Sequence, residues 1–267
     1  MELCYPRFIH SEMLTHRDRA RNSASSRAIP WKRFKGEAQS GSDPAEMIKK
    51  CMFRMIMDDP VTPLEFGTEQ KGMVAGIKLE GEKAQEAMNI WLRARDAALL
   101  AADALSDLGV HKSLCNRLTE PFMWITVVMT STDWKNFFAL RTASDAEIHM
   151  QYIAKMMKYA FVCSEPQYLV PGTWHMPYID PSEMTKYAAT ELRAISAGRC
   201  ARVSYLTHDG LRDPMADIRL GARLVKDKHA SPLEHVAEAT NEPLLRSGPF
   251  RGWRQYRKTM PDDAVPE

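Results

Sequence analysis

The spacing of apolar residues predicts a helix-rich chain. In residues 81–108, alanines and larger apolar side chains recur at three- and four-residue intervals, and Gly109 supplies a stop. So many alanines would let another helix approach closely, so we expect a central helix or a subunit contact. The same reasoning predicts further helices at 10–16, 43–57, 133–141, 145–160, 183–197, 198–205 and 213–228.

Fewer segments read as strands. Residues 2–9 carry aromatic and branched side chains, and the run "PFMWITVVMT" at 121–130 has the character of a buried strand. From Arg17 to about Gly41 apolar periodicity is lost and Ser, Arg and Gly dominate. We therefore predict an α+β fold: one helix-rich domain over residues 1–267 with a small mixed or antiparallel sheet.

Local signals refine three places. Asp43, followed by a proline, is a plausible N-cap, and Asp133 or Thr132 is expected to cap the helix after the buried strand. The Pro- and Gly-rich stretch 58–80 is long enough to suggest a functional loop, although a plain surface excursion fits equally well. The tail 248–267 interleaves aromatic and basic residues. It could bind single-stranded nucleic acid, close over a ligand or pack on a neighbouring subunit.

Composition narrows the class of protein. The 267 residues are 45% hydrophobic and carry a net charge of +2, so no overall field draws the chain to nucleic acid or anionic membrane. Five scattered cysteines form no CxxC pair, which favours reduced thiols over a disulfide framework or a zinc site. No apolar run approaches membrane-spanning length, and the first residues lack the layout of a signal peptide. We expect a cytoplasmic protein.

Candidate chemistry is concentrated in the segment "THRDRARNSASSR", residues 15–27. Four arginines, a histidine, an asparagine and three serines lie within thirteen residues. Guanidinium groups form paired, charge-assisted bonds to phosphate, and hydroxyl and amide groups add donors. Composition alone leaves open a phosphate-binding segment and a solvated basic loop.

The spacing within this segment points further. His16-Arg17, Asn22, Ser25 and Arg27 fit the pattern H-R-x-x-S-x-N-x-x-S-x-R, with Ala20 in place of the first serine. The pattern resembles the signature of flavin-dependent thymidylate synthases. "DWKNFFALR" at 133–141, "CARVSY" at 200–205 and "KHASPLEH" at 228–235 resemble three other segments of that family.

The order of these segments differs from that of the family. Family members usually carry A-R-V-S-Y and the S-P-F-E-H turn before the arginine motif, whereas here both follow it. The chain therefore resembles a circularly permuted, divergent member. Permutation is tolerated when the original termini lie close together at the surface.

The resemblance implies a family-like fold and a reaction: transfer of a one-carbon unit from 5,10-methylenetetrahydrofolate to C5 of a pyrimidine nucleotide, most simply dUMP to dTMP, with FAD and NADPH. It also implies a homotetramer with shared active sites. Arg141 would polarise the pyrimidine ring, and no metal is implied. The implied FAD contacts are Thr15, His16, Arg17, Asn22, Thr130, Ser131, Thr132, Asn136, His229 and Ser231. The implied dUMP contacts are Glu12, Ser23, Ala24, Ser25, Ser26, Arg27 and Arg117.

Several substitutions keep alternatives open. Thr15 stands where the family has an arginine, Ser23 replaces a glutamate and Ala28 a tyrosine, while Arg19 and Arg21 add nearby cations. The substrate could be dCMP, the product could carry a hydroxymethyl group, or the fold could serve a non-catalytic nucleic-acid-binding protein. Taken alone, Arg141 would be read as a structural ion pair with Asp133 or Asp145.

Overall fold

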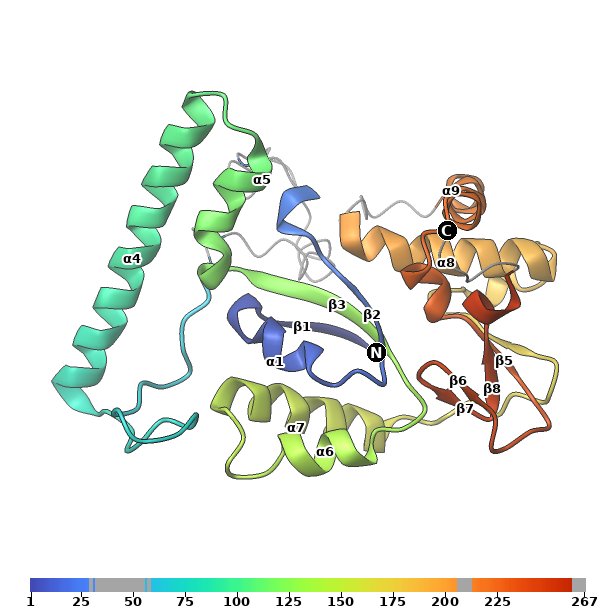
Figure 1. The fold of residues 1–267 in the computed structure, drawn as a ribbon, viewed down its shortest axis with the longest axis horizontal. Coiled ribbons are helices and arrows are strands. Elements are labelled where there is room, and N and C mark those ends of the chain that lie inside the picture. The colour runs from blue at the N-terminus through green and yellow to red at the C-terminus, as the bar shows by residue number, and fades with distance from the viewer. Residues whose placement is uncertain (29–30, 32–55, 57–58, 206–212, 261–267) are drawn as a thin grey trace, which may run out of the picture.

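A three-stranded antiparallel sheet lies at the centre of the computed structural model, which describes residues 1–28, 31, 56, 59–205 and 213–260 (Figure 1). Its strand order is β1-β3-β2, so the apolar strand β3 is central and is buried on both faces. The expected α+β class is confirmed. The strands are β1 (Glu2–Pro6), β2 (Ala20–Ser23) and β3 (Trp124–Thr130).

Helices α6 (Lys135–Arg141) and α7 (Ile148–Cys163) lie against this sheet. Phe137 and Met150 from these helices join Tyr5, Ile125 and Val127 of the strands in one core cluster. All five side chains are at most 1% exposed. The helices predicted at 133–141 and 145–160 are therefore confirmed, and their apolar stripes face the sheet.

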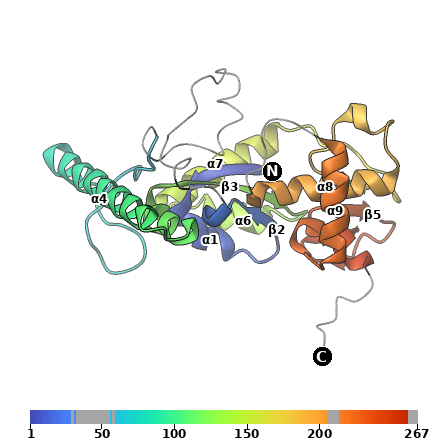
Figure 2. The same cartoon turned by 90° about the horizontal axis from the view of Figure 1, so that it is seen from above.

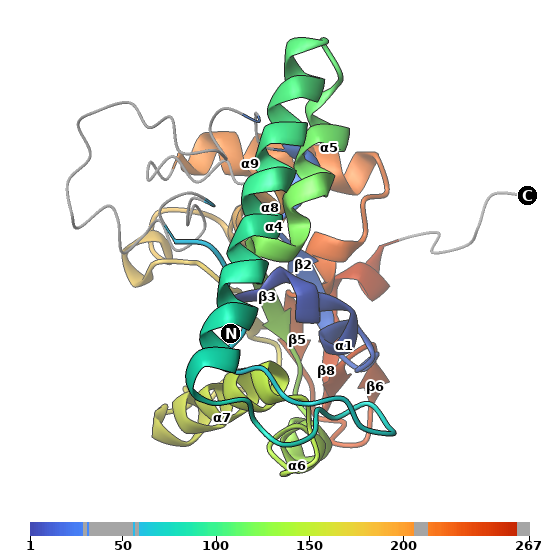
Figure 3. The same ribbon diagram turned by 90° about the vertical axis from the view of Figure 1, so that its left-hand side faces the viewer.

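The long helix α4 (Gly81–Asp107) confirms the helix predicted at 81–108, but it is not central. It projects from one end of the molecule (Figures 2 and 3). Only Leu99 and Ala102 are buried along it, while Ile90 and Leu100 are 52% and 71% exposed. The expectation of a central helix is wrong because one side of α4 packs in a core cluster with residues such as Phe122, while the rest of the helix is exposed. Its role as a subunit contact stays a prediction.

Short elements connect these layers. Near the sheet they are η1 (Arg7–Ile9), α1 (His10–Leu14), η2 (Ser26–Ala28), α5 (Lys112–Cys115) and η4 (Asn116–Phe122). In the C-terminal part they are β4 (Trp174–His175), η5 (Pro181–Glu183), η6 (Ser231–Glu234), β5 (Ala237–Ala239), β6 (Arg246–Ser247), β7 (Phe250–Arg251), β8 (Trp253–Gln255) and η7 (Tyr256–Thr259).

Three sequence expectations are corrected. The supposedly irregular segment after Arg17 contains β2, because alternate inward positions let a very polar stretch pair with β3. The helices expected at 183–197 and 198–205 are one helix, α8 (Ala189–Tyr205). The N-cap of α6 is Trp134 and not Asp133 or Thr132. The helix predicted from Asp43 lies outside the described residues.

The aromatic-basic tail is part of the fold as far as residue 260. Strand β8 pairs with β5, and β5 pairs with β4, to form a second antiparallel sheet. Tyr256 packs edge-on against Trp174, and the Arg193 guanidinium lies over both rings. These aromatic faces are therefore used for packing within the chain. No helix in the described ranges is both long enough and apolar enough to cross a membrane.

Helices α8 and α9 (Pro214–Lys226) cross at very short range because glycines occupy the crossing. A Cβ atom on Gly198 would lie 2.7 Å from the carbonyl oxygen of Asp217, and one on Gly221 would overlap the carbonyl of Ala194. The absence of side chains at these two positions lets the backbones touch. The crossing holds the 200–205 segment against the central sheet.

A buried ion-pair network fixes the same crossing. Arg199, with a side chain 3% exposed, donates to Asp217 Oδ2 at 2.9 Å and to both carboxylate oxygens of Glu183 at 2.6 and 2.7 Å. Arg202 donates to the other Asp217 oxygen at 2.6 Å. One carboxylate thus compensates two cations from the neighbouring helix.

Removing the Asp217 carboxylate is expected to destabilise the protein strongly. In Asp217→Ala, buried Arg199 loses a partner, and breaking a buried pair in this way costs about 3–5 kcal/mol. The matched control is Asp213→Ala at the exposed N-cap of the same helix, where loss of the cap costs about 1 kcal/mol. Urea denaturation of both variants measures the difference, and equal losses would contradict a structural role for the network.

Candidate functional site

Strand β2 is the place where the segments of the arginine motif and the A-R-V-S-Y motif meet. The Asn22 amide donates to the carbonyl of Cys200 at 3.2 Å, across 178 sequence positions. The backbone N–H of Ser25 donates to the carbonyl of Ser204 at 3.0 Å. Helix α8 and β2 are therefore joined by hydrogen bonds from both motifs.

The displaced 228–235 turn reaches the same region. His235 is fully buried, and its Nδ1 lies 2.8 Å from the Thr130 hydroxyl at the end of β3. Burial is the main reason that the pKa of His235 is lowered to about 3, so the ring is neutral. By contrast, His229 and Ser231 are exposed at the surface.

The 133–141 segment contacts the arginine motif through Arg141. Its Nε donates to His16 Nε2 at 2.7 Å, and its Nη2 donates to the Thr15 hydroxyl at 2.9 Å, although about 125 residues separate them. Burial first, and then the Arg141 charge, lower the pKa of His16 to about 4. A neutral His16 accepts this bond, and the guanidinium keeps further N–H groups for a ligand. The ion pair with Asp133 or Asp145, which was the alternative reading of Arg141 taken alone, is not formed among these described residues.

The extra arginines in the motif have structural partners. Arg19 is 8% exposed, lies over the rings of Trp134 and Phe137 at 5.1 and 5.0 Å, and donates to the Asp133 carbonyl. Arg21 donates to carbonyl oxygens at the end of α1, 2.9 Å from that of Leu14. Neither replaces the cation missing at Thr15. Arg17 is exposed.

The other implied flavin contacts lie between β3 and α6. The Ser131 hydroxyl donates to the Asp18 carbonyl at 3.1 Å, which links the two motif segments again. Thr132 accepts from the Arg251 N–H at 2.8 Å, so this turn is also held by the C-terminal part. Asn136 is exposed on α6.

The implied nucleotide contacts gather in a cleft of about 470 Å³ at the far end of β2. Six of the seven line it: Ser23, Ala24, Ser25, Ser26, Arg27 and Arg117. The seventh, Glu12, does not, and its carboxylate accepts from the Ser11 hydroxyl at 2.9 Å. Serine hydroxyls and guanidinium groups therefore share one concave surface.

Charge in this cleft is unevenly compensated. Arg7 pairs with Glu120 at 3.2 Å and also donates to the Ala24 carbonyl. The same carboxylate accepts from the Ser26 hydroxyl at 2.5 Å. Within the described part of the chain, Arg27 and Arg117 have no hydrogen-bond or ion-pair partner, and both are exposed. Two guanidinium groups are thus available to an anion.

The cleft and the Arg141 contacts are separate places within one chain. Thr15 and His16 precede β2, whereas Arg27 follows it, and four extended residues span about 13 Å. Neither Arg141 nor Ser231 lines the cleft. The motif segments converge on β2, but the implied catalytic arginine and the implied phosphate arginine lie at opposite ends of the strand.

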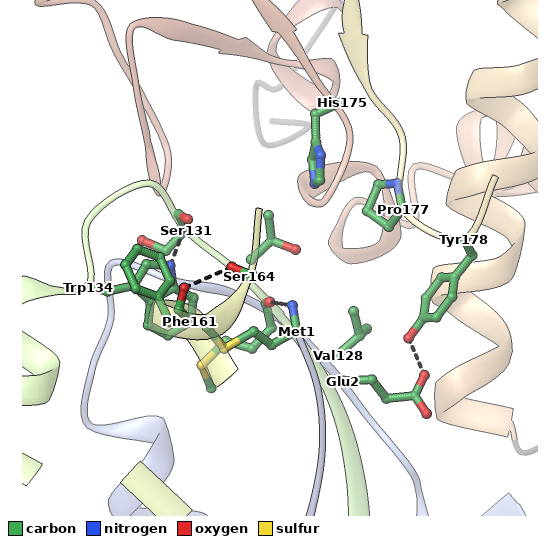
Figure 4. A pocket seen from close by; sticks show the side chains of 12 residues that line it. Met1, Glu2, Val128, Ser131, Trp134, Phe161, Ser164, His175, Pro177 and Tyr178 are labelled. Carbon is green, nitrogen blue, oxygen red and sulfur yellow. Dashed lines mark hydrogen bonds between the residues drawn. The ribbon is translucent and has the colours of Figure 1, made fainter. Parts of the chain in front are cut away.

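A second cavity of about 430 Å³ opens beside β3 (Figure 4). Thr130 and Ser131 lie in its wall with apolar side chains such as Trp134. On the opposite side Tyr178, whose φ of 65° is unusual for a residue with a side chain, donates to Glu2 at 2.5 Å. Burial, followed by the Glu2 charge, raises the pKa of Tyr178, so its hydroxyl stays protonated.

Sequence reasoning missed four residues of the cleft: Arg7, His10, Glu120 and Ile125. Arg7 begins η1, His10 begins α1, and Glu120 comes from η4. The sequence marked these residues only by their chemical type. His10 lies two positions before the implied contact Glu12 in the same short helix. Which residue of that helix faces the cleft depends on how α1 packs.

No protein-family model matches the chain, and no curated protein matches it. Among solved structures, the chain is similar to the UMP/dUMP methylase PolB from Streptomyces cacaoi bound with 5-Br dUMP, with 14% identity and a TM-score of 0.40. The match covers 60% of this chain and 64% of that one, so the chain spans under two thirds of the length of that structure. A likeness of this degree supports no argument about activity.

Proposed function

We propose that the protein is a flavin-dependent enzyme that transfers a one-carbon unit from methylenetetrahydrofolate to C5 of a pyrimidine nucleotide, converting dUMP to dTMP. The observation that carries the proposal is that three distant motif segments meet the arginine motif in and beside β2. Two of them bond to it directly, and the third contacts Thr130, which pairs with Ala20 of β2. A circular permutation preserves an active site when contacts, and not chain order, define it.

The cleft supports the nucleotide part of this proposal. A phosphate monoester carries up to two negative charges, and Arg27 and Arg117 offer two guanidinium groups that no described residue compensates, beside serine hydroxyls. Glu120 neutralises Arg7, so the site is not uniformly cationic. The result suits a single phosphate better than a longer polyanion.

Arg141 supports the chemical part. C5 of uracil becomes nucleophilic only when electron density enters the ring, and a guanidinium held against a ring oxygen or nitrogen stabilises that charge. His16 and Thr15 fix the orientation of Arg141 before a ligand arrives. The bound flavin, reduced by NADPH, would supply the two electrons that turn the transferred methylene into a methyl group.

The separation along β2 favours an active site shared between copies of the chain. Arg141 does not line the cleft that holds Arg27, and β2, which spans about 13 Å, lies between the two segments that carry them. In a homotetramer, Arg141 of one copy would approach the cleft of another. The exposed face of α4 would serve as a contact in this assembly.

Reconstitution with FAD tests the proposal directly. The purified protein is expected to retain a yellow chromophore and, with NADPH and methylenetetrahydrofolate, to convert dUMP to a product 14 mass units heavier, the mass of one CH₂ group. Parallel reactions with dCMP test the alternative substrate. The product mass, measured by mass spectrometry, distinguishes a methyl from a hydroxymethyl group. A protein that binds no flavin and modifies no nucleotide would contradict the proposal.

Arg27→Gln is the informative variant in the same assay. It should keep the flavin and raise the KM for dUMP by roughly 10-fold or more, because a charge-assisted contact to phosphate is lost. Arg219→Gln, at an exposed position on α9, is the matched control and should leave the KM unchanged. A variant protein without flavin would indicate instead that Arg27 supports the flavin site.

A further inference from the structure

His10 lies in the wall of the nucleotide cleft with one ring nitrogen occupied and the other open. Its Nδ1 is 2.8 Å from the Tyr5 hydroxyl, and the two rings stack at 6.0 Å with an interplanar angle of 30°. Its Nε2 has no partner among the described residues and is not a buried atom, so it is accessible to a ligand of the cleft that His10 lines.

The Tyr5 hydroxyl decides which nitrogen of His10 carries the proton. Tyr5 is 1% exposed, and in the described part of the chain its hydroxyl has no partner other than His10. A buried hydroxyl that fails to donate leaves an unsatisfied proton, which is costly. If Tyr5 donates, Nδ1 is the acceptor, and a neutral ring then carries its proton on Nε2.

The surroundings keep this ring neutral. Burial is the main cause that lowers the pKa of His10 to about 4, and Arg7 on η1 and Arg21 on β2 lower it further, while Glu120 on η4 opposes them. Tyr5 on β1 is itself uncharged, because burial raises its pKa. Near neutral pH, His10 therefore presents an uncharged N–H donor.

We propose that His10 is a nucleotide-binding residue of the cleft, held by Tyr5 as the Nε2–H tautomer so that it donates a hydrogen bond to an oxygen atom of the bound nucleotide. The inference rests on the proposed function, because it takes a nucleoside monophosphate as the ligand. Arg27 and Arg117 attract the phosphate by charge, whereas a neutral imidazole adds a directional bond without further positive charge. Tyr5 is then a positioning residue, which acts through His10.

The tautomer can be measured without any ligand. In ¹⁵N-labelled protein at neutral pH, the His10 signals should show a protonated Nε2 and an unprotonated Nδ1, and the ring should stay neutral down to about pH 4. In Tyr5→Phe, the preference for this tautomer should be lost. A wild-type ring protonated on Nδ1, or one that titrates near pH 6.5, would overturn the inference.

Side-chain geometry supplies matched variants for binding. The amide of glutamine can reach the position of Nε2, whereas that of asparagine reaches only as far as Nδ1. By calorimetry, His10→Gln should bind dUMP within about 3-fold of wild type, and His10→Asn and His10→Ala should bind it about 10-fold more weakly. His111→Asn, at an exposed helix N-cap, is the control and should bind as wild type does.

Further titrations distinguish a failure of the inference about His10 from a failure of the proposed function. Titration with deoxyribose 5-phosphate and with inorganic phosphate shows whether the contacted oxygen belongs to the base, the sugar or the phosphate. If wild type binds dUMP but His10→Ala binds it equally well, the inference fails while the proposed function stands. If wild type binds no nucleotide, the proposed function fails, and the inference fails with it even if the ligand-free tautomer is found as expected.

Discussion

Arg141→Ala is expected to lower the kcat for nucleotide methylation by roughly 10²- to 10³-fold, while KM changes little. The physical reason is the loss of a preoriented cation where charge develops in the pyrimidine ring, a contribution of about 3–4 kcal/mol in comparable sites. His16 and Thr15 hold the guanidinium in place at 2.7 and 2.9 Å. Steady-state kinetics with dUMP measures the effect.

Two further variants separate charge from orientation. Arg141→Lys keeps the charge but loses the planar fork, and should remain well below wild type. Thr15→Val removes the oxygen that accepts from Nη2, and should reduce kcat by only a few-fold because the bond to His16 survives. The Arg219→Gln control should behave as wild type. If Arg141→Ala turns over within a few-fold of wild type, the ring-polarising role is wrong.

Mild acid is expected to destabilise the fold by about 4 kcal/mol between pH 7 and pH 5. Burial lowers the pKa of His175 to about 4 and that of His235 to about 3, from an ordinary value of 6.5. Between pH 6.5 and 4 the unfolded chain binds these protons and the folded chain does not, so the free energy of unfolding falls as pH falls. At pH 5 each histidine contributes about 2 kcal/mol to this loss.

Urea denaturation at pH 7.5, 6.0 and 5.0 measures how the free energy of unfolding changes with pH. His10 and His16, which are more exposed, should add smaller contributions of the same sign. His175→Gln removes one titrating group and should flatten the profile by close to half. His111→Asn removes an exposed histidine and should leave the profile unchanged. A stability that does not vary between pH 5 and 6.5 would contradict the account.

Local patterns predicted most of the secondary structure because they are imposed by burial. The apolar run in β3 is buried along nearly its whole length, and the stripe on α7 faces the sheet, so a strand and a helix were recognisable. The strand β2 was not recognised, because its inward positions are Ala20 and Asn22 and not large apolar residues. Its extended conformation comes from pairing with β3, which is invisible in a local window.

The residues of the candidate site likewise fall into those that the sequence indicated and those that only the structure revealed. The family resemblance implied Ser23 to Arg27 as nucleotide contacts, and these five residues line one cleft because consecutive residues that end a strand and begin a short helix stay together. Arg117, implied by the same resemblance, comes to the cleft from a segment about 90 residues away. His10 was missed, since its place in the cleft depends on the packing of α1 against β1.

By itself, the sequence determined the chemical types and their local order: an arginine-rich motif, an apolar central strand and amphipathic helices. Only the tertiary structure decided that Arg141 meets His16, that Arg19 and Arg21 are occupied by structural contacts, and that Arg27 and Arg117 have no partner among the described residues. The physical reason is that periodicity reports burial of an element's own face, whereas distances between residues over a hundred positions apart are set by packing.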